Sequence, residues 1–514
     1  MPQKLTHIKS YMKKILINDE PWQTRIAITR NALLQNIYFS SPLHENLEGS
    51  FYRGTVTAVL PGIQTAFVDI GQEKAGFLHI SEIDRELAIS KGQELDPLDD
   101  DATQKRRPRV KADISKIFKE GDSILVQVSK EPVYEKGAKL STCFMLPGRF
   151  IVLMPNIPRM AISKKIEKAE DRRALRELVK SNLPETMGAI IRTTSEGQDE
   201  KAILKDITCL LDTWREIQAN FEKSKPQERI YKDIALPLQI IRDHLDADVE
   251  AVITDSKENQ SILTNFIKST APEHSANVRL YKGETNIFDF YNIEKQIDLA
   301  LEKKVQLKSG GSLIIEAAEA MTVIDVNTGK FTGKRNLEDT IFKTNLEAAE
   351  EVVRQLRLRN VGGLIVIDFI DMASSANQRK LSAFFEKTLR EQDKFQSVVL
   401  KISELGLAQM TRKRSGKTLI AELTNNCCTC SGSGFVRSVP TKSHAILRSA
   451  KYEILTKKPG TELTIQLPSD VFEYISSCEY NTILTLERTL GIKLTLEKSR
   501  DQLPTAQYKI IAKR

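Results

Sequence analysis

Two short apolar segments on either side of one amphipathic helix constrain the fold more than any other feature of this chain. The segment "SLIIEAAEAMTVIDVN" from Ser312 predicts two strands, and "GGLIVIDFIDM" from Gly362 predicts a buried third strand. Apolar residues at three- and four-residue steps predict a helix between them: Phe342, Leu346, Ala349, Val353 and Leu356. Strands that alternate with helices indicate an α/β sheet, whose functional residues gather at strand ends.

The length and charge of the chain suit a multidomain protein with a polyanionic partner. Its 514 residues exceed one hydrophobic core, and a prior of about 150 residues per domain predicts about three or more domains. Lysine and arginine total 76 against 68 acidic residues, and the net charge of +8 favours polyanions without requiring them. No long apolar run and no secretory leader are visible in the sequence, so we expect a cytoplasmic protein without a membrane span.

The segments before the α/β sheet predict a small β barrel and a mixed region. Short β runs separated by glycines extend from Gly49 to Met145, around a charged insertion at residues 91–111 that we interpret as a solvated loop. Residues 147–237 predict two strands, a charged helix from about Ile166 and a long helix from about Asp199. The core-facing stripe of that helix is predicted to be Ile203, Ile207, Leu210, Trp214, Ile217 and Phe221. The tail after Phe435 predicts a small α+β unit, with strands at "ELTIQLP" and "IKLTLEKS" and a helix near "VFEYI".

Asp325, Asn327 and Asp368 carry the strongest indication of chemistry. Asp325 and Asn327 stand two residues apart in a strand, so both side chains leave the same face. Asp368 ends an apolar run, where a carboxylate is costly unless it is paired, hydrogen-bonded or metal-bound. Two carboxylates and an amide suit Mg²⁺, which keeps several waters. One strand-end aspartate alone is more often a structural group, but the two strands together favour a metal site.

The segments "VIDVNTGK" and "TNLEAAEEVVRQLRLRNVGGLIVIDFIDM", with a later cysteine pair, resemble the catalytic region of the ribonuclease E/G family. The likeness covers nearly the whole chain and is nearer to the shorter ribonuclease G type, because it stops where the scaffold of ribonuclease E would begin. It implies a deoxyribonuclease I-like catalytic domain in which Asp325 and Asp368 bind Mg²⁺ and Asn327 positions the scissile phosphate or its water.

The implied activity is endonucleolytic cleavage of single-stranded RNA, in rRNA maturation or mRNA decay, with 5′-phosphate and 3′-hydroxyl products. A route through the 2′-hydroxyl usually needs acid and base groups, often histidines, and the six histidines of this chain lie far from Asp325 and Asp368 in the sequence. Two alternatives stay open. One is a non-catalytic RNA-binding protein, and the other is a metal-dependent nuclease that acts mainly on DNA.

The predicted barrel resembles an S1 domain of the OB-fold class, which binds single strands by stacking bases on aromatic rings beside basic groups. Phe67 and Phe77 occupy the places of the family's stacking rings, and Lys136 matches a lysine of the same surface. A phenylalanine in a short strand is more often a core residue, but the match to the S1 pattern reverses that preference here.

The segment "GAIIRTTSEG" resembles the family's sensor of a 5′-monophosphate. Arg192 and Thr193 stand in the matching places, and both residue types suit phosphate because they donate hydrogen bonds to its oxygens. Gly148 and Val152 occupy the matching backbone positions of the facing strand. The downstream "SEG" departs from the family's glycine-rich continuation.

Cys427 and Cys430 form a C-x-x-C pair, whose two thiolates can bind one tetrahedral Zn²⁺ but leave two positions unfilled. The resemblance implies that two subunits share one structural zinc, which makes a homodimer and leaves open whether dimers pair into tetramers. Cys428 replaces the family's usual proline, so it is open which thiols bind. A redox dithiol is the alternative, although the surrounding "NNCCTCSGSGF" lacks the strand-to-helix setting of such sites.

The domain boundaries that we expect follow the same resemblance. Residues 1–48 and 237–300 form two parts of a ribonuclease H-like domain, 49–145 the S1 domain, 146–236 the 5′-sensor region, 301–422 the deoxyribonuclease I-like domain, 423–434 the zinc link and 435–514 a small α+β C-terminal domain.

Overall fold

The computed structural model describes residues 12–43, 46–84, 113–132, 137–246, 248–271, 277–329, 337–400, 403, 407–414, 416–457, 460–499 and 508–512. The chain divides into two compact units, Met1–Ile420 and Ala421–Arg514. Lys136 and the charged insertion at residues 91–111 lie outside the described residues, so the predictions for both stay predictions. No helix in the described ranges is long and apolar enough to cross a membrane.

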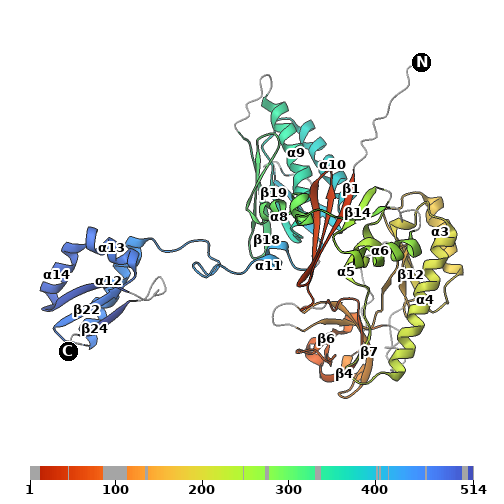
Figure 1. The fold of residues 1–514 in the computed structure, drawn as a ribbon, viewed down its shortest axis with the longest axis horizontal. Coiled ribbons are helices and arrows are strands. Elements are labelled where there is room, and N and C mark those ends of the chain that lie inside the picture. The colour runs from red at the N-terminus through yellow and green to blue at the C-terminus, as the bar shows by residue number, and fades with distance from the viewer. Residues whose placement is uncertain are drawn as a thin grey trace. The chain divides into compact units, whose positions relative to one another are not determined.

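The first sheet joins two segments that lie far apart in the sequence, and we call it the split sheet. Its strands are β1 (Lys13–Glu20), β2 (Gln23–Arg30), β3 (Leu33–Ser40), β14 (Val249–Thr254) and β15 (Val278–Leu280), in the order β15-β14-β1-β2-β3. β14 runs parallel to both β1 and β15, and Figure 1 shows β1 beside β14. The helices of this region are α5 (Leu236–His244), α6 (Lys257–Thr270), α7 (Ile287–Phe290) and α8 (Ile293–Leu301).

The predicted barrel is present. It consists of β4 (Phe51–Leu60), β5 (Thr65–Asp69), β6 (Gly76–His79), β8 (Lys139–Ser141) and β7 (Ser123–Lys130), and it closes because β4 also pairs with β7. The short helix α2 (Ile114–Ile117) contributes to its core, and β13 (Arg229–Tyr231) extends β4. Alternate strand residues, such as Ala66, Val68 and Leu78, fill the interior.

A four-stranded sheet and two helices follow the barrel. The strands are β9 (Leu146–Pro147), β10 (Ile151–Met154), β11 (Met160–Ile162) and β12 (Gly188–Ile191), and the helices are α3 (Ala169–Ser181) and α4 (Glu200–Lys223). α4 begins as predicted, with the side chain of Asp199 accepting a hydrogen bond from the Lys201 N–H. The predicted stripe from Ile203 to Ile217 is buried, and Phe221 at its end is half-buried.

The strands and helix that were predicted after Ser312 are confirmed and belong to a mixed sheet, which we call the Asp325 sheet. It contains β16 (Lys304–Gln306), β17 (Ser312–Ala317), β18 (Met321–Asn327), β19 (Gly363–Asp368), β21 (Leu407–Arg412) and β20 (Ser397–Val399), in that order. Only the β18–β19 pair is parallel among them. Helices α9 (Leu337–Leu358) and α10 (Ser375–Gln392) pack against one face, with Val352 and Phe385 in the shared core.

The second unit has its own small core. β22 (Glu462–Leu467) lies between β23 (Lys493–Lys498) and β24 (Lys509–Ala512), with β23 parallel and β24 antiparallel to it. The helices are α12 (Val439–Lys457), α13 (Ser469–Cys478) and α14 (Tyr480–Leu490), and α11 (Leu419–Leu423) lies at the boundary with the first unit. The two predicted strands and the helix between them are confirmed; α12 and α14 were not predicted.

Candidate metal centre and RNA-binding surfaces

Asp325 and Asp368 lie side by side on the Asp325 sheet. β18 and β19 run parallel, and Asp325 is the register partner of Asp368, so both carboxylates leave one face at the carboxyl ends of the two strands. Their neighbours Ile324 and Ile367 point the other way, into the core shared with α9 and α10. The period of two along each strand therefore turns both acids outward.

The electrostatics around Asp368 favour a bound cation. Burial, together with the negative charges of Asp325 and Asp371, raises the pKa of Asp368 above its ordinary value. Asn327 Nδ2 donates to Asp325 Oδ2 at 2.7 Å, so the amide orients one oxygen of the pair. A positive ion between the carboxylates would offset their mutual repulsion, which is the next cause of the raised pKa after burial.

The donor set fits Mg²⁺. The described part of the chain contains no group of three or more histidine, cysteine or acidic side chains that could together bind a metal ion. An ion at Asp325 and Asp368 would therefore complete its shell with the Asn327 amide, with water or with substrate oxygens. Mg²⁺ is bound in this way, through one or two carboxylates and retained waters.

Two side chains of α9 hold the loop that follows Asp368. Asn345 is fully buried; its amide nitrogen donates to the Ile370 carbonyl at 2.8 Å, and its oxygen accepts from the Ile370 N–H at 3.1 Å. The Glu338 carboxylate accepts from the Ser374 N–H at 3.1 Å, and this bond is the main cause of its lowered pKa. These bonds fix the backbone on the carboxyl side of Asp368.

Phe67 and Phe77 lie on the outside of the barrel. They are register partners on the antiparallel strands β5 and β6, and both rings are half-buried, whereas the flanking Ala66, Val68 and Leu78 are buried. Neither ring belongs to the barrel core. The structure thus places the two predicted rings beside each other on the barrel surface.

Arg192 follows β12 and reaches the turn between β9 and β10. Its guanidinium donates to the Gly148 carbonyl at 2.6 Å and forms an ion pair with Asp243 at 2.7 Å. Val152 lies on β10, the strand that pairs with β12, and Thr193 is exposed next to Arg192. The four residues predicted for the sensor therefore lie on one small sheet and its edge.

The turn itself is fixed by a carboxylate from α4. Asp206 accepts hydrogen bonds from the backbone N–H groups of Arg149, Phe150 and Ile151 at 3.2, 2.9 and 3.3 Å. Burial raises the pKa of Asp206, and these three N–H groups oppose that shift. A Cβ on Gly148 would lie 2.5 Å from an oxygen of this carboxylate, so the turn requires glycine there.

Comparison with known proteins gives the affiliation. The model of the "Ribonuclease E/G family" matches residues 145–415, and that of the "S1 RNA binding domain" matches residues 47–142. Ribonuclease G of Escherichia coli (strain K12) is 38% identical over 435 residues, which cover 85% of this chain and 86% of that protein. The chain belongs to the ribonuclease E/G family. It is an endoribonuclease of that family with an S1 RNA-binding domain.

Other members of the ribonuclease E/G family are similar over most of this chain, but the share of their own length that is matched differs. Ribonuclease G of Haemophilus influenzae is 40% identical over 85% of this chain and 86% of its own length. Ribonuclease E of Escherichia coli (strain K12) is 34% identical over 97% of this chain but only 46% of its own length. The predicted affiliation, including the likeness to ribonuclease G, is thus confirmed.

The cysteine pair of this family member lies between α11 and α12. A further model, "RNase E/G, Thioredoxin-like domain", matches residues 426–514 and includes the pair. Hydrogen bonds from the Cys430 and Thr429 N–H groups lower the pKa of the exposed Cys427 thiol, which favours the thiolate that zinc requires. Among the described residues, no strand directly precedes Cys427 and the turn that follows it. This part of the chain therefore lacks the strand-to-helix arrangement of a redox dithiol.

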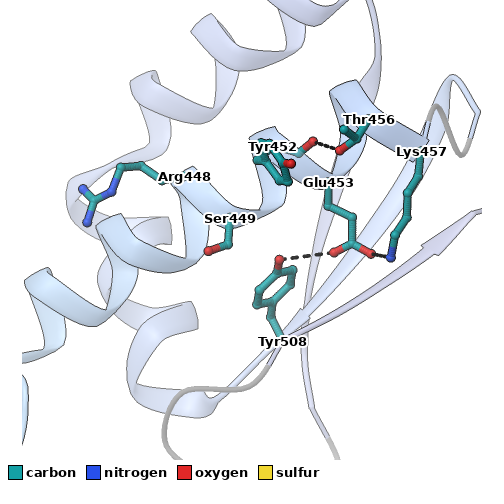
Figure 2. Close-up of a pocket in the computed structure, with 7 residues that line it drawn as sticks. All are labelled: Arg448, Ser449, Tyr452, Glu453, Thr456, Lys457 and Tyr508. Carbon is teal, nitrogen blue, oxygen red and sulfur yellow. Dashed lines mark hydrogen bonds and ion pairs between the residues drawn. The ribbon is translucent and has the colours of Figure 1, made fainter.

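A hollow of about 430 Å³ beside α12 contains none of the predicted site residues (Figure 2). The carboxylate of Glu453 accepts from Lys457 Nζ at 2.6 Å and from the Tyr508 hydroxyl at 3.2 Å. Tyr452 on the same helix is 71% exposed. Because Glu453 is satisfied by these neighbours, we assign the hollow no part in catalysis.

Sequence reasoning missed three residues around these sites. Asp371 was visible as the second aspartate of "DFIDM", but its effect on Asp368 was not considered. Asn345 sits in the predicted helix, and only the packing of α9 on the sheet brings it to the loop after Asp368. Asp243 has no local signal, because its pairing with Arg192 joins two elements about fifty residues apart.

Proposed function

We propose that this protein is a Mg²⁺-dependent endoribonuclease that cleaves single-stranded RNA and leaves 5′-phosphate and 3′-hydroxyl ends. The observation that carries the proposal is the pairing of Asp325 with Asp368 at the ends of β18 and β19. The raised pKa of Asp368 supports it, since carboxylates that repel each other on an exposed edge are suited to a divalent ion.

In this scheme the protein positions the reactants. Asp325 and Asp368 hold the metal, which when bound lowers the pKa of a water and neutralises charge on the phosphoryl oxygens. Asn327, whose amide already orients one Asp325 oxygen, positions the scissile phosphate or its water. Asn345 and Glu338 keep the backbone after Asp368 in place, so that the carboxylate does not move during in-line attack.

The barrel supplies the grip on the strand. Phe67 and Phe77 present two adjacent rings on which successive bases can stack, and this supports single strands over duplexes as substrates. A base that is paired in a helix has no free face for a ring. The same two rings therefore set the substrate class and leave the chemistry to the aspartates.

We further propose that Arg192, with Thr193 and the backbone at Gly148 and Val152, senses a 5′-monophosphate and thereby stimulates cleavage. Arg192 is already oriented by the Gly148 carbonyl and by Asp243, so its remaining donors face a defined direction. A phosphate dianion at this place must compete with the Asp243 carboxylate. The preference for a phosphorylated end then depends on the balance between the two anions.

Cleavage of matched RNA and DNA oligonucleotides, with and without Mg²⁺, tests the main proposal. Asp325→Asn and Asp368→Asn should each abolish cutting while RNA affinity stays close to wild type, because both lie outside the barrel. Asp298→Asn, which changes an exposed acid on α8, is the matched control and should cut normally. Strong Mg²⁺-dependent cutting by either site variant would remove the assignment, and preferential cutting of DNA would support a deoxyribonuclease instead.

A further inference from the structure

Three aromatic rings form a connected cluster beside the edge strand of the split sheet. The ring centroids of Tyr281 and Phe290 are 5.5 Å apart, and those of Phe290 and Tyr291 are 5.0 Å apart with the planes at 82°. Tyr281 directly follows β15, while Phe290 and Tyr291 lie at the end of α7. Phe290, the middle ring, is 64% exposed. An apolar ring that is held between two others and still faces solvent offers a stacking surface.

Positive side chains surround the cluster. Lys14 Nζ lies 5.7 Å from the centroid of Tyr291, and the exposed Arg279 acts electrostatically on the Tyr291 phenol. Lys282, next to Tyr281, is exposed as well. Cations beside exposed rings are the combination that single-stranded nucleic acid recognises, because bases stack while the backbone is neutralised.

The acidic groups nearby are largely engaged by the protein itself. Glu250 pairs with Lys14 at 3.8 Å. Asp255 accepts from Asn18 Nδ2 at 2.8 Å and from the Asp19 N–H at 2.9 Å. Glu284 and Asp289 are exposed, and they set a limit on the net positive charge of the surface. The rings must therefore contribute more to binding than long-range attraction does.

Tyr281 also belongs to a hollow of about 680 Å³, whose other lining residues are polar or charged apart from one leucine: Asp255, Lys257, Gln260, Ser261, Leu280 and Lys282. The Tyr281 hydroxyl is within hydrogen-bond distance of Thr285 Oγ1, at 3.1 Å. A Cβ on Gly283 would lie 2.1 Å from that hydroxyl oxygen, so glycine at this position makes room for the ring. The local sequence thus fixes Tyr281 between the ring cluster and a polar hollow large enough for a nucleotide, in which two lysines face one aspartate that is already hydrogen-bonded by Asn18 and Asp19.

We propose that Tyr281, Phe290 and Tyr291 form a second contact for single-stranded RNA, separate from the barrel rings, with Lys14, Arg279 and Lys282 meeting its phosphates. Bases stack on the exposed face of Phe290, and a neighbouring nucleotide enters the hollow beside Tyr281. The polar lining of the hollow, with two lysines and one engaged aspartate, favours RNA over an apolar protein segment. Substrate bound here and at the barrel would be held at two points of the chain.

Photocrosslinking of the full chain to a long uridine-rich single strand that carries 4-thiouridine tests where RNA lies. The experiment uses EDTA in place of Mg²⁺, so that the strand stays intact. Crosslinked peptides should include the segment Tyr281–Tyr291 as well as peptides from the barrel. Crosslinks confined to the barrel and the Asp325 sheet would overturn the proposal.

Affinity measurements give the second test. Phe290→Ala should weaken binding of the long single strand by about fivefold or more, the lower bound for one stacked base, and should leave binding of a blunt RNA duplex unchanged. Arg279→Glu should also weaken binding of the single strand and should make its loss of affinity with salt shallower, because fewer counterions are released when one phosphate contact is removed. Tyr452→Ala, which removes another exposed ring on the second unit, is the matched control and should bind normally.

Each contrary result has a distinct meaning. An unchanged affinity of Phe290→Ala, with its melting temperature intact, would show that the ring packs against the protein or serves a protein partner, and the proposal fails. An equal loss for single strand and duplex in Phe290→Ala would show that the ring does not act by stacking on unpaired bases, which also overturns the proposal. Because Phe290 is exposed, its removal is not expected to prevent folding.

Discussion

At the scale of the residue, we expect the environment of Asp368 to limit activity at low pH. Its raised pKa has burial as the first cause and the charges of Asp325 and Asp371 as the others. Protons and Mg²⁺ compete for the same carboxylate, so cleavage should fail as the pH drops through this raised pKa. Asp371→Asn removes one of the charges that raise it. We expect the acid limb of the cleavage profile to move to lower pH in this variant, measured as initial rate against pH.

The raised pKa of Asp368 also affects the stability of the folded protein. A folded-state pKa above the ordinary value means that ionising Asp368 costs folding free energy, and this cost grows as the pH rises above that ordinary value. Asp368→Asn should therefore melt at the same or a higher temperature than wild type at neutral pH, and the difference should vanish in acid. The outcome that would contradict the pH prediction concerns the cleavage profile. If Asp371→Asn leaves the acid limb of the initial rate against pH unchanged, that limb belongs to a group other than Asp368.

Substitutions of Arg192 and of Asp243 should have opposite effects on the cleavage of RNA with a 5′-monophosphate. Although burial raises the pKa of Asp243, the charges of Arg192 and Arg242 hold it below its ordinary value, so the acid is ionised and opposes an incoming phosphate. Arg192→Ala should slow cleavage of 5′-monophosphorylated RNA to the rate for 5′-hydroxyl RNA. Asp243→Asn should lower the KM for the phosphorylated strand alone. Equal changes with both strands would assign the pair to folding.

At the scale of elements, the antiparallel pairing of β5 with β6 determines which aromatic rings the barrel exposes to RNA. Because Phe67 and Phe77 are register partners, their rings lie side by side. Each ring can stack its own base, so neither replaces the other. Phe67→Ala and Phe77→Ala should each weaken single-strand affinity by about 1–3 kcal/mol while kcat on bound RNA changes little. Fluorescence anisotropy and single-turnover cleavage separate the two effects. An unchanged affinity in a folded variant would indicate a packing role.

Elements with a strong period could be predicted from the sequence, while their partners in space could not. β18, α9 and β19 follow from apolar spacing, and the two-residue step places Asp325 and Asn327 on one face. The neighbours of β19 in the sheet could not be predicted in this way. β21 pairs with β19 in antiparallel register, and no local sequence pattern indicates this pairing. The split sheet is a further case. β1 pairs in parallel with β14 across more than two hundred residues, and such pairings are set by packing.

At the scale of the whole molecule, the two compact units carry different parts of the proposal. The first contains the acids, the barrel rings and Arg192, while the second contains the cysteine pair and a small core of its own. All the residues that we propose for cleavage and for binding the RNA thus lie in the first unit. The contribution of the cysteines is therefore best sought in assembly, where a shared metal can join two copies.

The last prediction concerns that assembly and depends on ligand counting. A structural zinc takes four ligands, and Cys427 with Cys430 supplies two; a symmetric dimer brings the same patch from each subunit to its axis and supplies the rest. Metal analysis should find about half a zinc per chain. The double variant Cys427→Ser, Cys430→Ser should lose zinc and sediment as monomer.

Two single variants serve as controls for this test. Cys478→Ser changes an exposed thiol elsewhere in the second unit and should keep both zinc and dimer. Cys428→Ser should do the same if the neighbouring thiol takes no part. One full zinc per chain, or a double variant that stays dimeric without metal, would show that the shared-zinc link is wrong. Loss of zinc in Cys428→Ser would instead place that thiol among the ligands, because the backbone N–H groups that lower the pKa of the Cys427 thiol are unaffected by the change.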